Sequence, residues 1–284
     1  MDKLLALEQF VMDYKIRNCR PKTIESYRFQ LTQFFDYCGE VPVKVDITKI
    51  KEYLLYLITV KKYGTSSQNV AHSSIMVFFK RIFQLEWPRA AIGRPKVENK
   101  LPQVLNQKET KKLISSISNL KQRVAISLIY SSGLRISEFI NLAAKDIDST
   151  QMYVMVRGGK GQKDRTTLLS MSCLILLREY YLAYRPAKYL FNGANKTRPY
   201  GKTSLNNIVK NAAKKAGITK SISIHTLRHS FATHLLENGC NLFYIKELMG
   251  HKSLKTTMVY LHLCSKCMQN IQNPLDKMFG DEKL

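Results

Sequence analysis

The chain has 284 residues, of which 45% are hydrophobic, so it is long enough to bury the core of one large domain or of two modest ones. Its 45 Lys and Arg against 21 Asp and Glu give a net charge of +24, which exceeds what solubility requires and favours a polyanionic partner. No apolar run approaches the roughly 20 residues needed to span a bilayer, and the amino-terminal stretch MDKLLALEQFVMDYK carries acidic residues unlike a signal peptide. We therefore expect a cytoplasmic protein with no membrane partner.

Residues 1–86 predict a small domain of four or five helices. A first helix covers LLALEQFVMDY, and a second, TIESYRFQLTQFFDYC, follows Pro21 and ends at Gly39. Asp46 is suited to cap a third helix, and Ser66 or Ser67 a fourth. Residues 87–102, WPRAAIGRPKVENKLP, lose this periodicity and predict a basic, extended linker between two domains.

Residues 103–284 predict a second domain that is mostly helical. One helix stops at Gly133, and another runs from Ser204 to Ala216 and stops at Gly217. Between them, YVMVRGGKGQKDRTTLLS reads as two strands joined by a glycine-rich basic turn, which is typical of a β-hairpin. The expected fold class is therefore mainly α with a small β-sheet.

The six cysteines are scattered over a long chain, which favours free thiols over a disulfide framework. The single CxxC spacing, from Cys264 to Cys267, has no second pair, so neither a metal site nor a redox site is favoured there. The sequence leaves the role of these two residues open.

The stretch from Ile224 to Leu263 concentrates polar residues that carry chemistry. His225 and Arg228 lie three apart in a predicted helix, about 60° from each other, so that both would face one ligand. His251 follows a helix that ends at Gly250, and Ser253 is predicted to cap the helix that carries Tyr260. Each residue alone is more often structural, but their combination indicates a site.

A further arginine, Arg135, begins a predicted helix just after Gly133, with Glu138 three residues later. Taken alone this is an ordinary i,i+3 ion pair worth a few tenths of a kcal/mol. Whether the Arg135–Glu138 pair belongs to a functional site depends on the motifs found elsewhere in the chain.

Four motifs in order, SSGLRISEFINL, GGKGQKDR, HTLRHSFATHLL and MGHKSLKTTMVY, resemble those of the tyrosine recombinase (phage integrase) family, especially its compact Xer-like and transposon-type members. The resemblance is close over residues 103–263 and looser over 5–86. It implies a SAM-like core-binding domain and a catalytic domain that close on DNA as a C-shaped clamp. It also implies site-specific cleavage and rejoining through a 3′-phosphotyrosyl intermediate and a Holliday junction, without ATP, metal or other cofactor.

The resemblance also implies a role for each polar residue of the motifs. Arg135 and Arg228 would bind the non-bridging oxygens of the scissile phosphate, and Tyr260 would attack it. His225 would accept or relay the tyrosine proton, His251 would donate a hydrogen bond to the phosphate, and Glu138 would orient the arginine. The general acid would be a lysine of the hairpin turn, with Lys160 favoured over Lys163.

The expected partner is double-stranded DNA that carries specific recombination sites, bound by a homotetramer, with room for a partner recombinase or accessory proteins. Phosphate contacts would give affinity with little sequence selectivity. The candidates for such contacts, chosen by position, are Lys22, Arg28, Lys80, Arg81, Arg157, Arg165, Arg198 and Lys202. The carboxyl-terminal tail would pack against a neighbouring protomer.

Two alternatives share much of this pattern. A type IB topoisomerase uses the same chemistry to relax supercoils, but the short chain and the RHSFATHLL motif favour recombination. A catalytically silent DNA-binding regulator would have the same charge, yet it would have no reason to keep both arginines, Lys160 and Tyr260 together.

Overall fold

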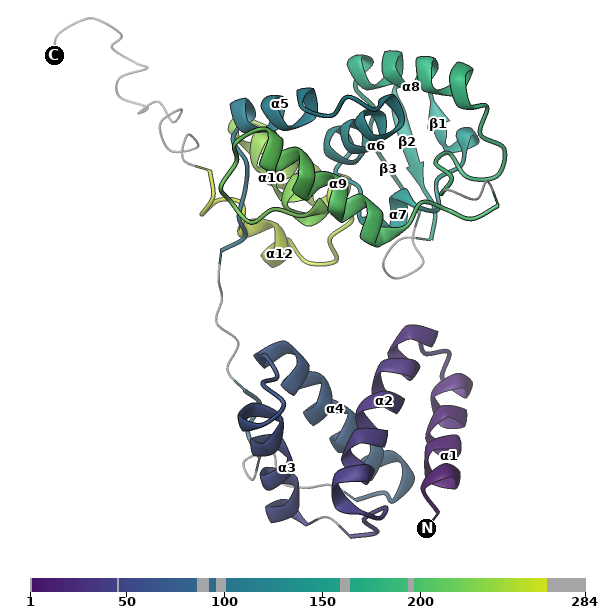
Figure 1. The fold of residues 1–284 in the computed structure, drawn as a ribbon, viewed down its shortest axis with the longest axis vertical. Coiled ribbons are helices and arrows are strands. Elements are labelled where there is room, and N and C mark those ends of the chain that lie inside the picture. Colours follow the sequence, from purple (N-terminus) through teal and green to yellow (C-terminus); the bar gives the residue numbers. More distant parts are fainter. Residues whose placement is uncertain are drawn as a thin grey trace, which may run out of the picture. The chain divides into compact units, whose positions relative to one another are not determined.

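The computed structural model describes residues 2–44, 46–85, 92–95, 101–158, 164–193 and 197–264. The chain divides into two compact units, Met1–Asn99 and Lys100–Leu284, shown in Figure 1. In the described parts, no helix has the length and apolar character needed to cross a membrane. The predicted tail beyond Cys264 lies outside the described residues.

The amino-terminal unit contains four helices in its described part. They are α1 (Lys3–Ile16), α2 (Pro21–Cys38), α3 (Ile47–Thr59) and α4 (Thr65–Ile82). The predicted ends of α2 and α3 are confirmed, since Gly39 ends α2 at φ 77° and Asp46 accepts hydrogen bonds from the first turn of α3. Helix α4 begins one residue before the predicted serine caps, directly after Gly64.

Aromatic side chains from α1, α2 and α4 form the core of this unit. Phe10, Phe35 and Phe78 are buried, and the rings of Phe35 and Phe78 meet edge to face with centroids 5.0 Å apart. Each of these residues lies on the inward face of a helix that the apolar periodicity of the sequence predicted.

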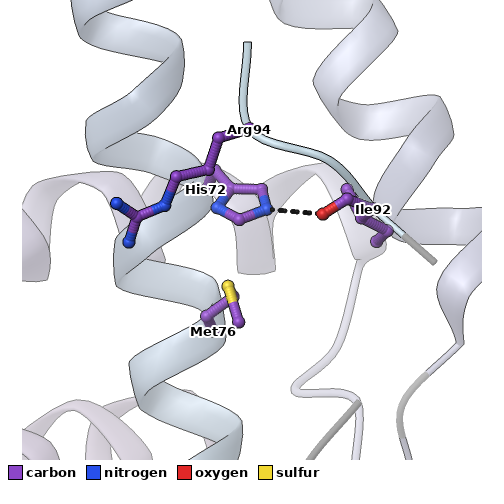
Figure 2. Close-up of a pocket in the computed structure, with 4 residues that line it drawn as sticks. All are labelled: His72, Met76, Ile92 and Arg94. Carbon is purple, nitrogen blue, oxygen red and sulfur yellow. Dashed lines mark hydrogen bonds between the residues drawn. The ribbon is translucent and has the colours of Figure 1, made fainter. Parts of the chain in front are cut away.

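The short segment 92–95, which we predicted to be part of an extended linker, packs on α4. His72 donates a hydrogen bond from Nε2 to the carbonyl of Ile92 at 3.2 Å, as Figure 2 shows, and Asn69 donates to the carbonyl of Pro95 at 3.3 Å. Ile92 is 7% exposed. Segment 92–95 of the predicted linker is therefore attached to the amino-terminal unit, where the side chain of Ile92 is buried.

The carboxy-terminal unit is helical with one small sheet. Its elements are α5 (Gln107–Ser115), α6 (Leu120–Ser131), α7 (Ile136–Phe139), the 3₁₀ helix η1 (Ala144–Asp146), β1 (Ile147–Asp148), β2 (Tyr153–Val156), β3 (Arg165–Leu168), α8 (Met171–Tyr184), α9 (Lys202–Lys215), α10 (Ile224–Glu237), α11 (Leu242–Met249) and α12 (Leu254–Met258). The predicted hairpin is confirmed as β2 and β3, which pair antiparallel with Tyr153 opposite Leu168 and Val156 opposite Arg165. The added strand β1 is too short to show a sequence pattern.

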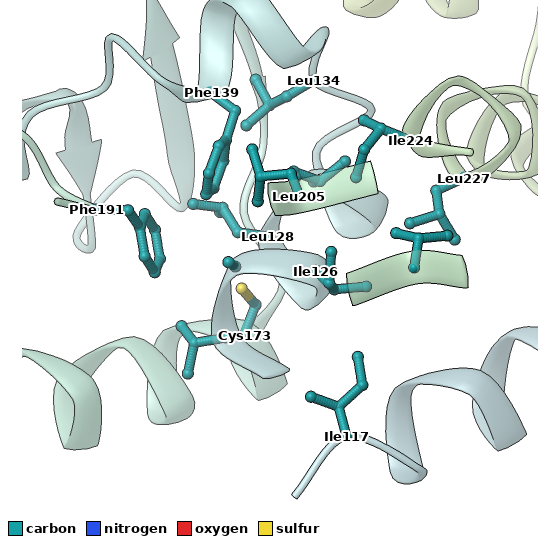
Figure 3. Close-up of a cluster of buried hydrophobic side chains, with 14 of the residues drawn as sticks. Ile117, Ile126, Leu128, Leu134, Phe139, Cys173, Phe191, Leu205, Ile224 and Leu227 are labelled. Atoms are coloured by element: carbon teal, nitrogen blue, oxygen red, sulfur yellow. The ribbon is translucent and has the colours of Figure 1, made fainter. Parts of the chain in front are cut away.

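Helix α6 lies at the centre of this unit and packs against α5, α8, α9 and α10. Residues Val124 to Ile129 are all buried, so this part of α6 is enclosed on every side rather than along one stripe. Figure 3 shows Ile126 and Leu128 of α6 among side chains from the surrounding elements, including Leu205 of α9 and Leu227 of α10. The end of α6, where Gly133 lies, is therefore held by a packed core.

Among the described residues, Cys19, Cys38, Cys173 and Cys240 are free thiols, as we predicted. Cys264 differs, because its sulfur is in a disulfide whose partner lies outside the described residues. A disulfide requires specific separations and directions of two cysteines, and the CxxC spacing noted in the sequence does not by itself establish them.

Candidate active site

The turn after α6 presents Arg135. Gly133 adopts φ 56°, a conformation that suits glycine, and Arg135 then occupies the N-cap position of the short helix α7. The backbone N–H of Arg135 donates to Glu138 Oε2 at 2.8 Å, and its Nη1 donates to Glu138 Oε1 at 2.6 Å. The predicted start of a helix at Arg135 is confirmed, although the helix is only one turn long.

Glu138 connects three arginines. Besides Arg135, Arg165 of β3 donates to its Oε2 at 2.8 Å, and Nη1 of Arg228 lies 3.8 Å from the same oxygen. The carboxylate is 7% exposed. Burial alone would raise its pKa, but the charge of Arg165 and the hydrogen bonds and charge of Arg135 outweigh it and lower the pKa of Glu138 below its ordinary value of 4.5.

Arg165 was among the residues we predicted to contact DNA from the surface, and the structure places it differently. Its side chain is 11% exposed and its guanidinium is bonded to Glu138 and to the carbonyl of Leu248, at 2.6 Å from Nη1. Burial, followed by the charge of Glu138, dominates its environment, and the net effect lowers its pKa. Arg165 is thus a third guanidinium of the site, which sequence position on a hairpin could not show.

The carboxyl end of α11 accepts hydrogen bonds from all three arginines. Three successive carbonyls are used, Leu248 by Arg165, Met249 by Arg228 and Gly250 by Arg135, the last at 2.9 Å. The last carbonyls of a helix have no intrahelical donor and carry partial negative charge, so cationic donors are favoured there. This arrangement connects α10, α11, the α6–α7 turn and β3 at one point.

Arg228 comes to this point from α10 and is 3% exposed. It also donates to the carbonyl of Gly133, so it joins the turn before Arg135 to the end of α11. Burial, followed by the neighbouring charge of Arg135, lowers the pKa of Arg228 to about 9, and the group remains a cation at neutral pH.

His251 follows Gly250, whose φ of 60° ends α11 as predicted. The Nδ1 atom of His251 lies 3.0 Å from Oγ1 of Thr257, a fully buried residue of α12. Burial and then the charges of Arg228 and Arg135 lower the pKa of His251 to about 3, so the ring is neutral. In the tautomer in which Nδ1 accepts from the Thr257 hydroxyl, Nε2 carries the proton and can donate it to a ligand.

Tyr260 lies in the turn after α12 rather than within the predicted helix. Helix α12 ends at Met258, because Thr256, Thr257 and Val259 are poor helix formers, and the Tyr260 N–H donates to the carbonyl of Thr257 at 3.0 Å. The phenol is 1% exposed and its ring lies parallel to that of His251, with centroids 6.2 Å apart. Burial raises the pKa of Tyr260 to about 12, while Arg228 and Arg135 act in the opposite direction.

The hydroxyl of Tyr260 is hydrogen bonded to His229, a residue the sequence analysis did not select. Nδ1 of His229 lies 3.1 Å from the phenolic oxygen. His229 is four residues after His225 in α10, and residues at that spacing share a helix face, so a signal was present in the sequence.

His225, in the first turn of α10, is exposed. Partial burial, followed by the charges of Arg228 and Arg135, lowers the pKa of His225, so both arginines act on it electrostatically. Lys160 and Lys163 lie outside the described residues. The strands that lead to their turn end at the site, since Arg165 at the start of β3 belongs to it.

The other predicted DNA-contacting residues lie on the surface of their units. Arg157 is paired with Asp146 at 2.8 Å while its side chain remains 57% exposed. Exposed positions are also found for Lys22, Arg28, Lys80, Arg81, Arg198 and Lys202. No group of His, Cys, Asp and Glu suited to a metal ion occurs within the described ranges.

Known proteins share this architecture. Residues 103–266 match the phage integrase family, and residues 6–89 match the SAM-like amino-terminal domain of phage integrases. The tyrosine recombinase XerA of Pyrococcus horikoshii is 33% identical over 266 residues, covering 92% of this chain and 90% of that protein. The tyrosine recombinase XerD of Staphylococcus aureus is 31% identical, covering 88% of this chain and 91% of that protein.

Among solved structures, the XerH site-specific recombinase bound to its palindromic difH substrate in a post-cleavage complex has the same fold. It is 23% identical, with a TM-score of 0.73, and the match covers 93% of this chain and 82% of that one. The two family matches together cover most of the chain.

The chain therefore belongs to the phage integrase family. It is a tyrosine-type site-specific recombinase that acts on DNA, with a SAM-like core-binding domain followed by a catalytic integrase domain.

Proposed function

We propose that Tyr260 is the nucleophile with which this recombinase cleaves DNA, and that Arg135 and Arg228 bind the scissile phosphate. The observation that carries the proposal is that both guanidiniums are fixed at the end of α11 and that the charges of both lower the pKa of the Tyr260 phenol against the effect of its burial. Each arginine is held by carbonyls and by Glu138, so little ordering remains when a phosphate arrives.

The reaction needs charge neutralisation because a phosphodiester anion repels nucleophiles. Attack by the phenolic oxygen on phosphorus forms a 3′-phosphotyrosyl bond and releases a 5′-hydroxyl. His251 and His225 are proposed to approach the same phosphate. The hydrogen bond between His251 Nδ1 and Thr257, and the position of His225 in the first turn of α10, support these roles. Lys160, with Lys163 as the alternative, is proposed to protonate the leaving oxygen.

The covalent ester conserves the energy of the broken DNA bond, so a 5′-hydroxyl from a second strand can displace Tyr260 without ATP. Two such exchanges on paired sites pass through a Holliday junction. We propose a homotetramer on two duplexes, in the cytoplasm, with a partner recombinase or accessory proteins where the sites require them. The XerH complex with difH supports DNA sites as the substrate.

A nicked duplex that traps the covalent intermediate tests the proposal. The binding sequence is obtained by repeated capture from a random-sequence duplex pool, and a nick is placed so that the cleaved end diffuses away. The wild-type protein should become covalently attached to the DNA, and Tyr260→Phe should bind the same duplex without attachment. Attachment by the Phe variant would refute the proposal. Relaxation of supercoils with no site preference would instead indicate a topoisomerase.

A further inference from the structure

The proton of the Tyr260 phenol must leave when the oxygen attacks, and the structure limits where it can go. The phenol is 1% exposed, so bulk water has little access to it. Its hydroxyl has a histidine acceptor within hydrogen-bond distance, Nδ1 of His229 at 3.1 Å. The rings of the two residues are tilted by 50° with centroids 5.8 Å apart, which brings an edge of the imidazole toward the hydroxyl.

We propose that His229, through Nδ1, accepts the proton of the Tyr260 hydroxyl as its oxygen bonds to phosphorus, and returns the proton when the strand is resealed. The inference rests on Tyr260 being the nucleophile. The inference makes His229 the acceptor of the phenolic proton. His225, which is exposed one turn earlier in α10, then has the separate role of contacting the phosphate.

The step balances without another reactant. In cleavage the phenolic O–H proton passes to His229, the oxygen–phosphorus bond forms, and the bond from phosphorus to the 5′ oxygen breaks as the proposed lysine protonates that oxygen. In resealing the 5′-hydroxyl returns its proton to the lysine and attacks phosphorus, and the departing phenolate takes the proton back from the His229 imidazolium.

The surroundings of His229 suit an acceptor that starts neutral. Burial, followed by the charges of His225 and Arg228 on the same helix, lowers its pKa to about 4, and His251 and Tyr260 face it from the neighbouring turns. A neutral imidazole protonated on Nε2 presents the Nδ1 lone pair to the hydroxyl. A phosphate bound by Arg135 and Arg228 neutralises nearby positive charge, which makes His229 more basic when attack occurs.

Two substitutions separate proton acceptance from positioning. His229→Phe keeps a ring but removes the acceptor. His229→Asn places an amide oxygen near the position of Nδ1, so it keeps the hydrogen bond but cannot carry the proton. His225→Phe is the matched control from the same helix. The measurement is the first-order rate of covalent attachment at saturating nicked duplex between pH 6.5 and 9, together with the Kd for the duplex.

We expect His229→Phe to attach about 100-fold more slowly at pH 7, the loss typical of a missing general base. Its rate should rise about tenfold per pH unit, because hydroxide then replaces the base. His229→Asn should show the same slope with a smaller loss, and both variants should bind the duplex like wild type. The profile of His225→Phe should lie below that of the wild type and parallel to it.

A flat profile for either His229 variant, or a tenfold slope in His225→Phe alone, would overturn the assignment. If His229→Phe fails to bind duplex because it is misfolded, the slope of His229→Asn decides the question. These results are distinct from failure of the proposed nucleophile, which would appear as no attachment by wild type or as attachment by Tyr260→Phe.

Discussion

At the scale of single residues, the site is defined by an imbalance of buried charge. Arg135, Arg165 and Arg228 surround one carboxylate, Glu138, so three positive charges face one negative charge and leave a surplus of 3 − 1 = +2. The pentavalent transition state formed from a phosphodiester anion and a phenolate carries two negative charges. The surplus of +2 balances the two negative charges of the transition state, whereas the ground-state phosphodiester carries only one. The arginines therefore stabilise the transition state more than the substrate.

Glu138→Gln tests the carboxylate. Among the described residues Glu138 is the one anion paired with these three buried guanidiniums, so the free energy of unfolding should fall by about 3 to 5 kcal/mol. Urea denaturation measures this. Glu247→Gln is the control, because Glu247 is paired with Lys246 at the surface with 66% of its side chain exposed, and its effect should stay below about 1 kcal/mol. Equal losses in the two variants would contradict the role of Glu138.

Acid should destabilise the protein in two stages. His229 and His251 have pKa values lowered from 6.5 to about 4 and about 3, so below pH 6.5 the unfolded chain binds protons that the native histidines do not. The free energy of unfolding should therefore be at its maximum above pH 6.5 and should fall by a few kcal/mol toward pH 4. The lowered pKa of Glu138 adds a second loss below its ordinary value of 4.5. His229→Asn should make the first stage shallower, and an unchanged slope would argue against a neutral buried His229.

At the scale of elements, the end of α11 organises the site. Its last carbonyls receive one arginine each from β3, α10 and the α6–α7 turn, so four separate elements are connected through one helix end. His251 follows directly after that end, so its position depends on those bonds. We expect changes there to lower the cleavage rate more than the affinity for DNA.

Arg165→Gln separates these effects. It removes the charged bonds to Glu138 and to the carbonyl of Leu248, and should slow covalent attachment at least tenfold while leaving the salt dependence of binding unchanged. Arg157→Gln is the matched variant, since Arg157 lies at the same end of the hairpin, directly after the residue that pairs with Arg165, but with its side chain 57% exposed. If Arg157 contacts a phosphate, its variant should reduce the salt slope by about 1 with little effect on cleavage at saturation. If instead Arg165→Gln reduced the salt slope without slowing cleavage, Arg165 would be a residue that contacts DNA phosphates.

Gly133→Ala tests the turn that presents Arg135. A Cβ at this position would lie 2.4 Å from Cδ1 of Phe231, and the φ of +56° is strained for alanine. We expect a loss of about 2 to 4 kcal/mol in the free energy of unfolding, with slower cleavage in the folded fraction. Gly239→Ala has a similar strain at φ +82° but no atom within 4 Å, so it should lose only about 1 to 2 kcal/mol. Thermal denaturation of both variants measures the difference, and equal losses would mean that Phe231 moves aside.

At the scale of the whole molecule, charge is the dominant property. A net charge of +24, with exposed basic residues on both units, suits a protein that surrounds a duplex. The C-shaped clamp and the division into 1–86, 87–102 and 103–284 remain predictions. They imply many phosphate contacts spread over both units.

The salt dependence of DNA binding measures the number of phosphate contacts. A clamp with about ten phosphate contacts should give a slope of about −9 for the logarithm of the association constant against the logarithm of salt concentration. The duplex used for covalent trapping, titrated with the Tyr260→Phe variant at several salt concentrations, supplies the measurement without covalent attachment. A slope close to zero would rule out the clamp.

Much of this could be predicted from the sequence because the signals are local. The hairpin, the cap at Asp46 and the glycine ends of α2, α6 and α11 each depend on a few neighbouring residues. Motif order also indicated the family, and the family matches confirm it. Helix lengths were predicted less well, since α7 and α12 are single turns held by tertiary contacts rather than by helix propensity.

The sequence by itself determined which residue types the site contains, because the chemistry of a phosphodiester restricts the choice to cations, a nucleophile and proton carriers. Only the tertiary structure decided how they pair. Arg165 lies in the site instead of on the surface, and Tyr260 is hydrogen bonded to His229. Such pairings depend on distances between elements that are far apart in the chain, and they are set by how α6, α10 and α11 pack around a shared core rather than by any local pattern of residues.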